Sequence, residues 1–185
     1  MTKLENKPLL VFLYPNNKYG LFIFKSGYTS TRKIFNQTIK IRQANAALKT
    51  YNGNKVLLVP VRNPIDRFES AVNTFYNYKK HWPYSVDQLI DWHEQKTFYN
   101  PHFFEVSKML DNAKLCFDKI QLYTFPNHYK QMLLDGNYSS YIPHENIGKK
   151  DIVLTQQQIK KVQKLYVDDI QLYETIKTPG QLFVT

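Results

Sequence analysis

The residues best suited to chemistry lie just after the apolar run at residues 21–24. A lysine is followed there by a short turn that contains glycine, and then by several hydroxyl side chains. A strand that passes through a tight loop into a helix N-terminus forms an anion site, because the first N–H groups of a helix have no intrahelical partners. The lysine adds positive charge, and the hydroxyls add hydrogen-bond donors. We expect a phosphate or sulfate group to be held here by Lys25, Ser26, Gly27, Tyr28, Thr29, Ser30 and Thr31.

A second basic residue stands at the end of another apolar segment. Residues 55–61 are apolar on both faces, as in a strand buried inside a parallel sheet, and Arg62 follows them. Asn63 as N-cap and Pro64 at the first helical position predict that a helix begins here. Ser70 lies near the start of that helix. Open α/β sheets bind ligands at the carboxyl ends of their strands, so Arg62 is expected at a ligand site.

These residues depend for their positions on alternating strands and helices. The first two expected strands, residues 8–14 and 21–24, form either a hairpin or separate members of one sheet. An α/β fold follows from the alternation, as a single domain over residues 1–185 with a mostly parallel central sheet flanked by helices. Strands are expected over residues 8–14, 21–24, 55–61 and 118–125. Helices are expected over residues 29–48, from Pro64, over residues 85–95, from Asn100-Pro101, and from Thr155 as one last helix through residue 173.

Composition limits the possible partners. Lys and Arg number 25 against 15 Asp and Glu, which gives a formal charge of +10 and favours polyanionic partners. The single cysteine, Cys116, excludes an internal disulfide and a cysteine-based zinc site. The five histidines have no metal-ligand spacing, so we predict no metal. No apolar stretch has the form of a signal peptide or the length of a membrane span, and the expected location is the cytoplasm.

Two segments resemble motifs of the sulfotransferase family. Residues 25–30 are similar to Pro-Lys-Ser-Gly-Thr-Thr or Lys-x-x-x-Thr-Ser, which holds the 5′-phosphosulfate of 3′-phosphoadenosine 5′-phosphosulfate (PAPS). Residues 62–70 resemble Arg-Asp-Pro-x-x-Arg-x-x-Ser, which holds the 3′-phosphate. The order of residues is not that of a Walker A loop, where lysine follows the loop at the helix start. Further similarity to the carbohydrate (membrane-associated) branch lies at residues 101–103, 117–120, 143–146 and 166–173.

The chain also departs from the family pattern. Phe24 replaces the usual proline before the lysine, and Asn63 replaces the usual aspartate, although asparagine also caps helices. No glutamate is present near Phe125, where the branch commonly carries one, and the membrane anchor of the Golgi members is missing. These departures affect the identity of the acceptor more than that of the sulfate donor.

The resemblance implies a P-loop-like three-layer fold and a reaction. A sulfuryl group passes from PAPS to a hydroxyl of an acceptor, with a carbohydrate as the acceptor class. Lys25 would stabilise the charge that develops on the leaving oxygen. Arg62 and Ser70 would grip the 3′-phosphate. Lys149 and Lys150 would close over the same phosphate; the alternative for this pair is a charged loop without function.

The general base is less well defined by the sequence. No Asp, Glu or His lies between Thr31 and Lys55, the region from which many relatives draw their base. His102 matches a histidine common in the branch and is our first candidate, because histidine titrates in the range that this role needs. A purely structural role for His102 stays open. His144 or Glu145 is the next candidate.

A second class of function also fits the charge. The chain would then be a non-catalytic basic protein that binds a nucleotide or nucleic acid, as a degenerate sulfotransferase relative. The two classes differ in how charge is arranged. An enzyme needs Lys25, Arg62 and Ser70 in one pocket, whereas a nucleic-acid binder needs a continuous basic stripe.

Overall fold

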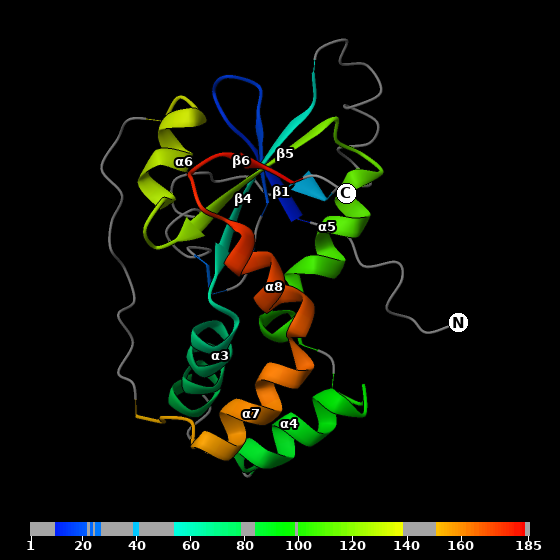
Figure 1. Cartoon of the computed structure of the whole chain (residues 1–185), viewed down its shortest axis with the longest axis vertical. Helices are drawn as coiled ribbons and strands as arrows, with labels where there is room; N and C mark the ends of the chain where they lie inside the picture. Colours follow the sequence, from blue (N-terminus) through cyan, green and yellow to red (C-terminus); the bar gives the residue numbers. More distant parts are fainter. Residues whose placement is uncertain are drawn as a thin grey trace.

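The structure is a computed structural model that describes residues 10–21, 23, 25–26, 39–40, 54–78, 84–98, 100–138 and 151–183. These residues form a sheet with helices packed against it, and the expected α/β class is confirmed (Figure 1). Within these ranges, no helix is both long and apolar enough to cross a membrane.

The described strands form one sheet with parallel pairing at its centre. In chain order they are β1 (Leu10–Leu13), β2 (Tyr19–Leu21), β3 (Ile39–Lys40), β4 (Val56–Arg62), β5 (Lys119–Phe125) and β6 (Gln181–Leu182). Their spatial order is β3-β1-β2-β4-β5-β6. The pairs β2–β4 and β4–β5 are parallel, and the outer pairs are antiparallel. The carboxyl ends of β2, β4 and β5 therefore meet at one edge of the sheet.

The first two strands form a hairpin, one of the two arrangements that the sequence left open. Val11 lies opposite Leu21 and Leu13 lies opposite Tyr19. The turn is closed by a bond from Tyr14 N to Lys18 O of 2.8 Å. Gly20 is required in this hairpin, because a Cβ atom there would lie only 2.0–2.5 Å from ring atoms of Phe12.

The helix expected over residues 29–48 is wrong as a continuous element. Ile39 and Lys40 form β3, which pairs antiparallel with Val11 and Leu10 of β1. The sequence Thr-Ile-Lys-Ile at residues 38–41 alternates β-branched and polar residues, which favours an edge strand. Residues 29–38 and 41–48, over which the rest of that helix was expected, lie outside the described ranges.

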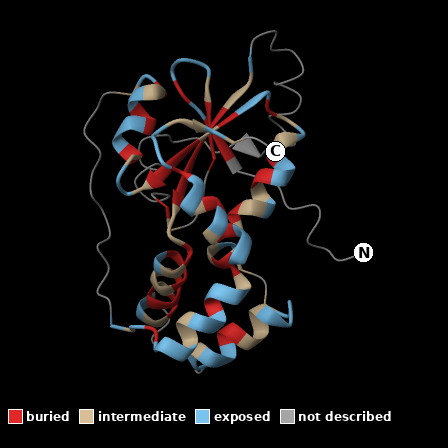
Figure 2. Cartoon of the chain, viewed as in Figure 1, coloured by how far each residue is buried: buried red, intermediate tan, exposed pale blue. Residues whose placement is uncertain are grey.

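Helices cover both faces of the sheet. Leu57, Val59 and Val61 of β4 face one hydrophobic cluster, which also contains residues of α5 (Val106–Lys114) and α8 (Val167–Thr175). Leu58 faces the opposite cluster, which contains residues of α6 (Tyr129–Asp135). The central strands are therefore buried on both sides, as Figure 2 shows, and the described elements form three layers.

A helical lobe packs beyond the carboxyl end of β4 (Figure 1). It contains α3 (Pro64–Tyr78), α4 (Val86–Glu94) and α7 (Gln156–Leu165), which share a separate hydrophobic cluster. The predicted start of α3 is confirmed, since Asn63 Oδ1 accepts from the N–H groups of Ile65 and Asp66. The helix starts predicted at Ser85 and Thr155 are confirmed as capping boxes.

Two other helix predictions were wrong in their continuity. The segment after Asn100 forms a short 3₁₀ helix, η1 (Pro101–Phe103), and α5 begins only at Val106. The single last helix is divided into α7 and α8 at Tyr166, which has φ −113° and ψ 32°. Both interruptions coincide with long-range hydrogen bonds, because the Phe103 and Phe104 carbonyl oxygens accept from Tyr166 Oη and Arg67 Nη1.

Candidate functional site

Lys25 lies in a tight turn after β2. Its φ of +65° is in the left-handed region, which costs a non-glycine residue roughly 1 kcal/mol. Ser26 N donates to Ile23 O across 3.2 Å and closes the turn. The Ser26 side chain is 1% exposed, and its hydroxyl has no hydrogen-bond partner among the described residues. The chain thus adopts a strained backbone at the first predicted site residue.

Arg62 lies beside Lys25. Its Nη1 donates to the main-chain oxygen of Lys25 across 3.0 Å. The guanidinium carbon is 5.9 Å from the ring centroid of Phe125, which stands opposite Arg62 in the β4–β5 register. The turn after β2 and the ends of β4 and β5 thus contribute one residue each to the same place. The two cations that the sequence singled out at separate strand ends are brought together.

Burial lowers the pKa of both cations. The pKa of Lys25 is lowered, first by burial and then by the charge of Arg62. Burial also lowers the pKa of Arg62, while the carboxylates of Asp66 and Glu69 act in the opposite direction. Two partly desolvated positive charges side by side are stabilised by an anion, and the effect is larger than it would be in open solvent.

His102 is a neutral imidazole held in one orientation. Asn100 Oδ1 accepts from the backbone N–H of His102 at 3.0 Å and lies 2.7 Å from His102 Nδ1. An amide oxygen only accepts, so Nδ1 carries the proton and Nε2 carries the lone pair. Burial, together with the charge of Lys25, lowers the pKa of His102 to about 4. The ring packs edge-on against Phe75 of α3, with centroids 5.7 Å apart.

A buried ion pair contacts the segment that follows His102. Arg67 Nη2 donates to Asp169 Oδ2 across 2.9 Å, and the two side chains are only 2% and 1% exposed. Arg67 also donates to Phe104 O, and its guanidinium carbon lies 5.3 Å from the ring centroid of Tyr166. The pair therefore connects α3, the segment after η1, and α8.

Of the other predicted site residues, the structure describes only Ser70. Ser70 is half-buried on α3, roughly 10 Å along the helix axis from Asn63, and the contacts of the described residues do not join it to Arg62. Asn73 of α3 makes a two-bond pair with the backbone of Ile152, just after the predicted basic pair at residues 149–150. Several predicted residues lie outside the described ranges: Gly27, Tyr28, Thr29, Ser30, Thr31, His144, Glu145, Lys149 and Lys150.

Sequence reasoning missed the residues that orient the others. Asn100 was read only as a helix cap, yet its side-chain oxygen also fixes the ring of His102. The partnership between Arg67 and Asp169 was not foreseen either, because the two residues are 102 positions apart. The only available signals were the second arginine of the 62–70 motif and the similarity at residues 166–173, and neither indicates pairing.

Across the part of the chain that the structure describes, no group of three or more His, Cys, Asp or Glu residues is arranged to hold a metal ion. Comparison with known proteins adds no assignment to this geometry: no family model matches the chain, and no significant match was found among curated proteins or solved structures.

Proposed function

We propose that the protein is a sulfotransferase with a P-loop-like fold, which transfers a sulfuryl group from PAPS to a hydroxyl of a carbohydrate acceptor. The observation that carries this proposal is the contact between Arg62 and Lys25. Motifs that resemble the two phosphate-binding motifs of the family begin at these residues, which are separated by 37 positions and joined by a 3.0 Å hydrogen bond. A nucleotide with phosphate groups at both its 3′ and 5′ positions needs such a pair of neighbouring cationic sites.

The chemistry of the described side chains fits a doubly phosphorylated nucleotide. Arg62 offers a planar fork of donors suited to a phosphate, and Lys25 offers a compact positive charge. The buried hydroxyl of Ser26 has no hydrogen-bond partner among the described residues, and a phosphate oxygen would satisfy it. The predicted donors at residues 27–31, together with Ser70, Lys149 and Lys150, would complete the site.

PAPS supplies an activated sulfuryl group whose sulfur is bonded to an oxygen of the 5′-phosphate. The acceptor oxygen forms a new bond to sulfur as that S–O bond breaks, and the electron pair stays on the phosphate oxygen of the departing adenosine 3′,5′-bisphosphate. Lys25 stabilises the charge on that oxygen. His102 takes the acceptor proton at Nε2, which carries the lone pair because Nδ1 is directed at Asn100.

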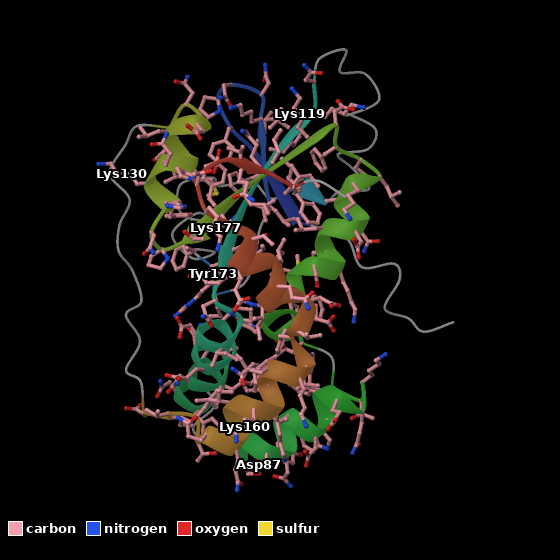
Figure 3. All side chains as sticks on the ribbon, viewed as in Figure 1. Asp87, Lys119, Lys130, Lys160, Tyr173 and Lys177 are labelled. Atoms are coloured by element: carbon pink, nitrogen blue, oxygen red, sulfur yellow. The ribbon has the colours of Figure 1, made fainter. Side chains whose placement is uncertain are left out.

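The meeting of Lys25 and Arg62 at one place favours the enzyme over a nucleic-acid binder. Figure 3 labels exposed lysines on separate elements: Lys119 on β5 and Lys130 on α6 lie toward one end of the molecule, and Lys160 on α7 lies near the other. Binding to a nucleic-acid backbone uses a continuous basic surface. In the part of the chain described, these lysines are dispersed, whereas Lys25 and Arg62 are gathered and partly buried.

Calorimetric titration with adenosine 3′,5′-bisphosphate tests the proposal. We expect binding with a Kd well below about 1 mM. The Arg62→Ala variant should weaken it by at least about 30-fold, because a charged hydrogen-bonding partner is removed from a partly buried site. Lys130→Ala removes an exposed lysine of α6 and is the matched control that should bind as the wild type does. Binding weaker than about 1 mM that is also unchanged in Arg62→Ala would rule out the donor assignment.

Activity is tested separately by incubating the protein with PAPS and a panel of oligosaccharides, and by measuring the release of adenosine 3′,5′-bisphosphate. Sulfated product that depends on both Lys25 and the oligosaccharide supports the carbohydrate acceptor. Nucleotide binding without transfer to any hydroxylated acceptor would favour the degenerate, non-catalytic relative.

A further inference from the structure

We propose that Arg67, Tyr166 and Asp169 are positioning residues, which hold the short turn that carries His102 in a fixed place relative to Arg62 and Lys25. The consequence for catalysis rests on the proposed sulfotransferase function. The positioning of His102 itself is a property of this chain that can be measured without any substrate.

The turn that carries His102 cannot hold itself in place. It is a three-residue 3₁₀ helix whose own backbone bonds are those from Phe103 N to Asn100 O and from Phe104 N to Pro101 O. Such short helices have poor hydrogen-bond geometry and depend on their surroundings. The next residues, Phe104 and Glu105, are extended. The turn is therefore not continued by a helix on its carboxyl side.

Side chains from two other elements hold the backbone directly after His102. Tyr166, at the junction of α7 and α8, donates its hydroxyl to Phe103 O across 2.6 Å. Arg67 of α3 donates Nη1 to Phe104 O. Phe103 is buried and Phe104 is half-buried, and their carbonyl groups, which would otherwise lack helical partners, accept from these two side chains.

Asp169 in turn fixes Arg67 and the start of α5. Its Oδ2 accepts from Arg67 Nη2 and from Val106 N, each at 2.9 Å. Its Oδ1 accepts from Ser107 N at 2.8 Å and from Ser107 Oγ at 2.7 Å. The N-cap residue of α5 makes no side-chain cap. Asp169 of α8 instead accepts from the first N–H groups of α5 and so caps that helix. A carboxylate with four donors holds one position, and through it Arg67 also holds one position.

Helix α3, which carries Arg67, connects the Arg67–Asp169 pair to the anion site at Lys25 and Arg62. Helix α3 begins directly after Arg62 and Asn63, and Arg67 N donates to Asn63 O in its first turn. Phe75, on the same helix, packs against the His102 ring. Since His102 is attached to α3 both by Arg67 through Phe104 and by Phe75, the distance from the candidate base to the candidate phosphate-binding arginine is set by α3.

The test compares two conservative tyrosine variants. Tyr166→Phe removes only the hydroxyl bound to Phe103 O. Tyr123→Phe is the matched control, because Tyr123 is also fully buried and its hydroxyl donates to Asp135 in the cluster on the α6 face of the sheet. NMR titration of the His102 ring is recorded for both. Among the described residues, the charge of Lys25 acts on the pKa of His102, and the ring contacts Asn100 and Phe75.

We expect the pKa of His102 to rise in Tyr166→Phe from about 4 by roughly one unit or more toward its ordinary value, because a loosened turn lets water reach the ring. In Tyr123→Phe it should stay unchanged. Affinity for adenosine 3′,5′-bisphosphate should be equal in both variants. In Tyr166→Phe, kcat should fall while KM for PAPS stays unchanged.

A folded Tyr166→Phe variant whose His102 titrates as in the wild type overturns the positioning role. Asp169→Asn provides the second variant, for which the same rise in the pKa of His102 is expected. Failure of the wild type to bind the nucleotide would remove the sulfotransferase proposal but would leave the titration result intact. The two ideas therefore fail on different measurements.

Discussion

Arg62 Nη1 donates a hydrogen bond to the main-chain oxygen of Lys25 across 3.0 Å, and this contact joins the end of β4 to the turn that follows its parallel neighbour β2. The acceptor is a backbone carbonyl in a turn where Lys25 has φ +65°. The arginine therefore supports the strained turn as well as adding charge to it. A change at either residue should alter the other, so their contributions to anion binding are expected to be non-additive.

Replacing Lys25 separates backbone strain from function. Lys25→Ala keeps the left-handed strain and removes the ammonium group, whereas Lys25→Gly removes both. We expect Lys25→Gly to be more stable than Lys25→Ala by up to about 1 kcal/mol, measured by urea denaturation. Both variants should lose about 10²–10³-fold in kcat, since a charge-stabilising group is gone. Equal stability of the two variants would contradict the strain argument, and a full rate in either would contradict the role of Lys25.

Acid should destabilise the protein through His102. The pKa of His102 is lowered to about 4 in the folded chain, below its ordinary value of about 6.5, so the unfolded chain binds the proton more readily. The contribution to stability is complete above pH about 6.5 and is lost as the pH falls toward 4. Because His102 is partly exposed, solvent screens part of this effect, and the loss of stability should be smaller than the full shift would give. Denaturation curves at several pH values should therefore show a weaker acid dependence for His102→Gln than for the wild type.

If His102→Gln follows the same pH dependence as the wild type between pH 7 and pH 4, the imidazole is not held neutral in the folded state. A pKa of about 4 leaves the ring unprotonated at neutral pH but makes it a weaker base than an ordinary histidine, so titration near neutral pH, the reason for which His102 was the first candidate, is not found in the structure.

The sequence was sufficient where the signal is local. The start of α3 follows from the Asn63-Pro64 pair, and the starts of α4 and α7 follow from Ser85 with Gln88 and Thr155 with Gln158. Caps of this kind use atoms within three residues of each other. Phe68, Val72 and Phe75, which recur at helical spacing in the sequence, form the buried face of α3.

The sequence was insufficient where distant groups compete with helical bonding. The carbonyl groups after His102 are taken by Arg67 and Tyr166, the latter 63 positions away, and the expected helix from residue 100 is interrupted there. Residues 39–40 became a strand because β1 offered an edge to pair with. In the candidate site, the meeting of Lys25 and Arg62 was predictable from parallel topology, whereas the orientation of His102 by Asn100 was not.

Breaking the buried ion pair should be costly, and replacing it with apolar residues less so. Asp169→Ala leaves the Arg67 guanidinium buried without its counter-charge and removes four accepted hydrogen bonds. We expect a loss of about 3–5 kcal/mol of stability, as for other buried pairs that lose one partner. The double variant Arg67→Met/Asp169→Leu should recover part of this loss. Chemical denaturation of the three proteins measures both effects, and a single-variant loss below about 1 kcal/mol would contradict the buried pairing.

Gly20 should be indispensable to the β1–β2 hairpin. Its position opposite Phe12 leaves no room for a side chain, because a Cβ atom would lie 2.0 Å from Phe12 Cζ. Phe12 is itself fully buried and packs edge-on against Tyr14, with centroids 4.8 Å apart, so its ring cannot move outward freely. We expect Gly20→Ala to cost about 1–3 kcal/mol. Shortening the opposing ring in Phe12→Leu/Gly20→Ala should make the double variant more stable than the sum of the two single losses predicts. Strict additivity in this double-mutant cycle would show that the two side chains do not compete for the same space.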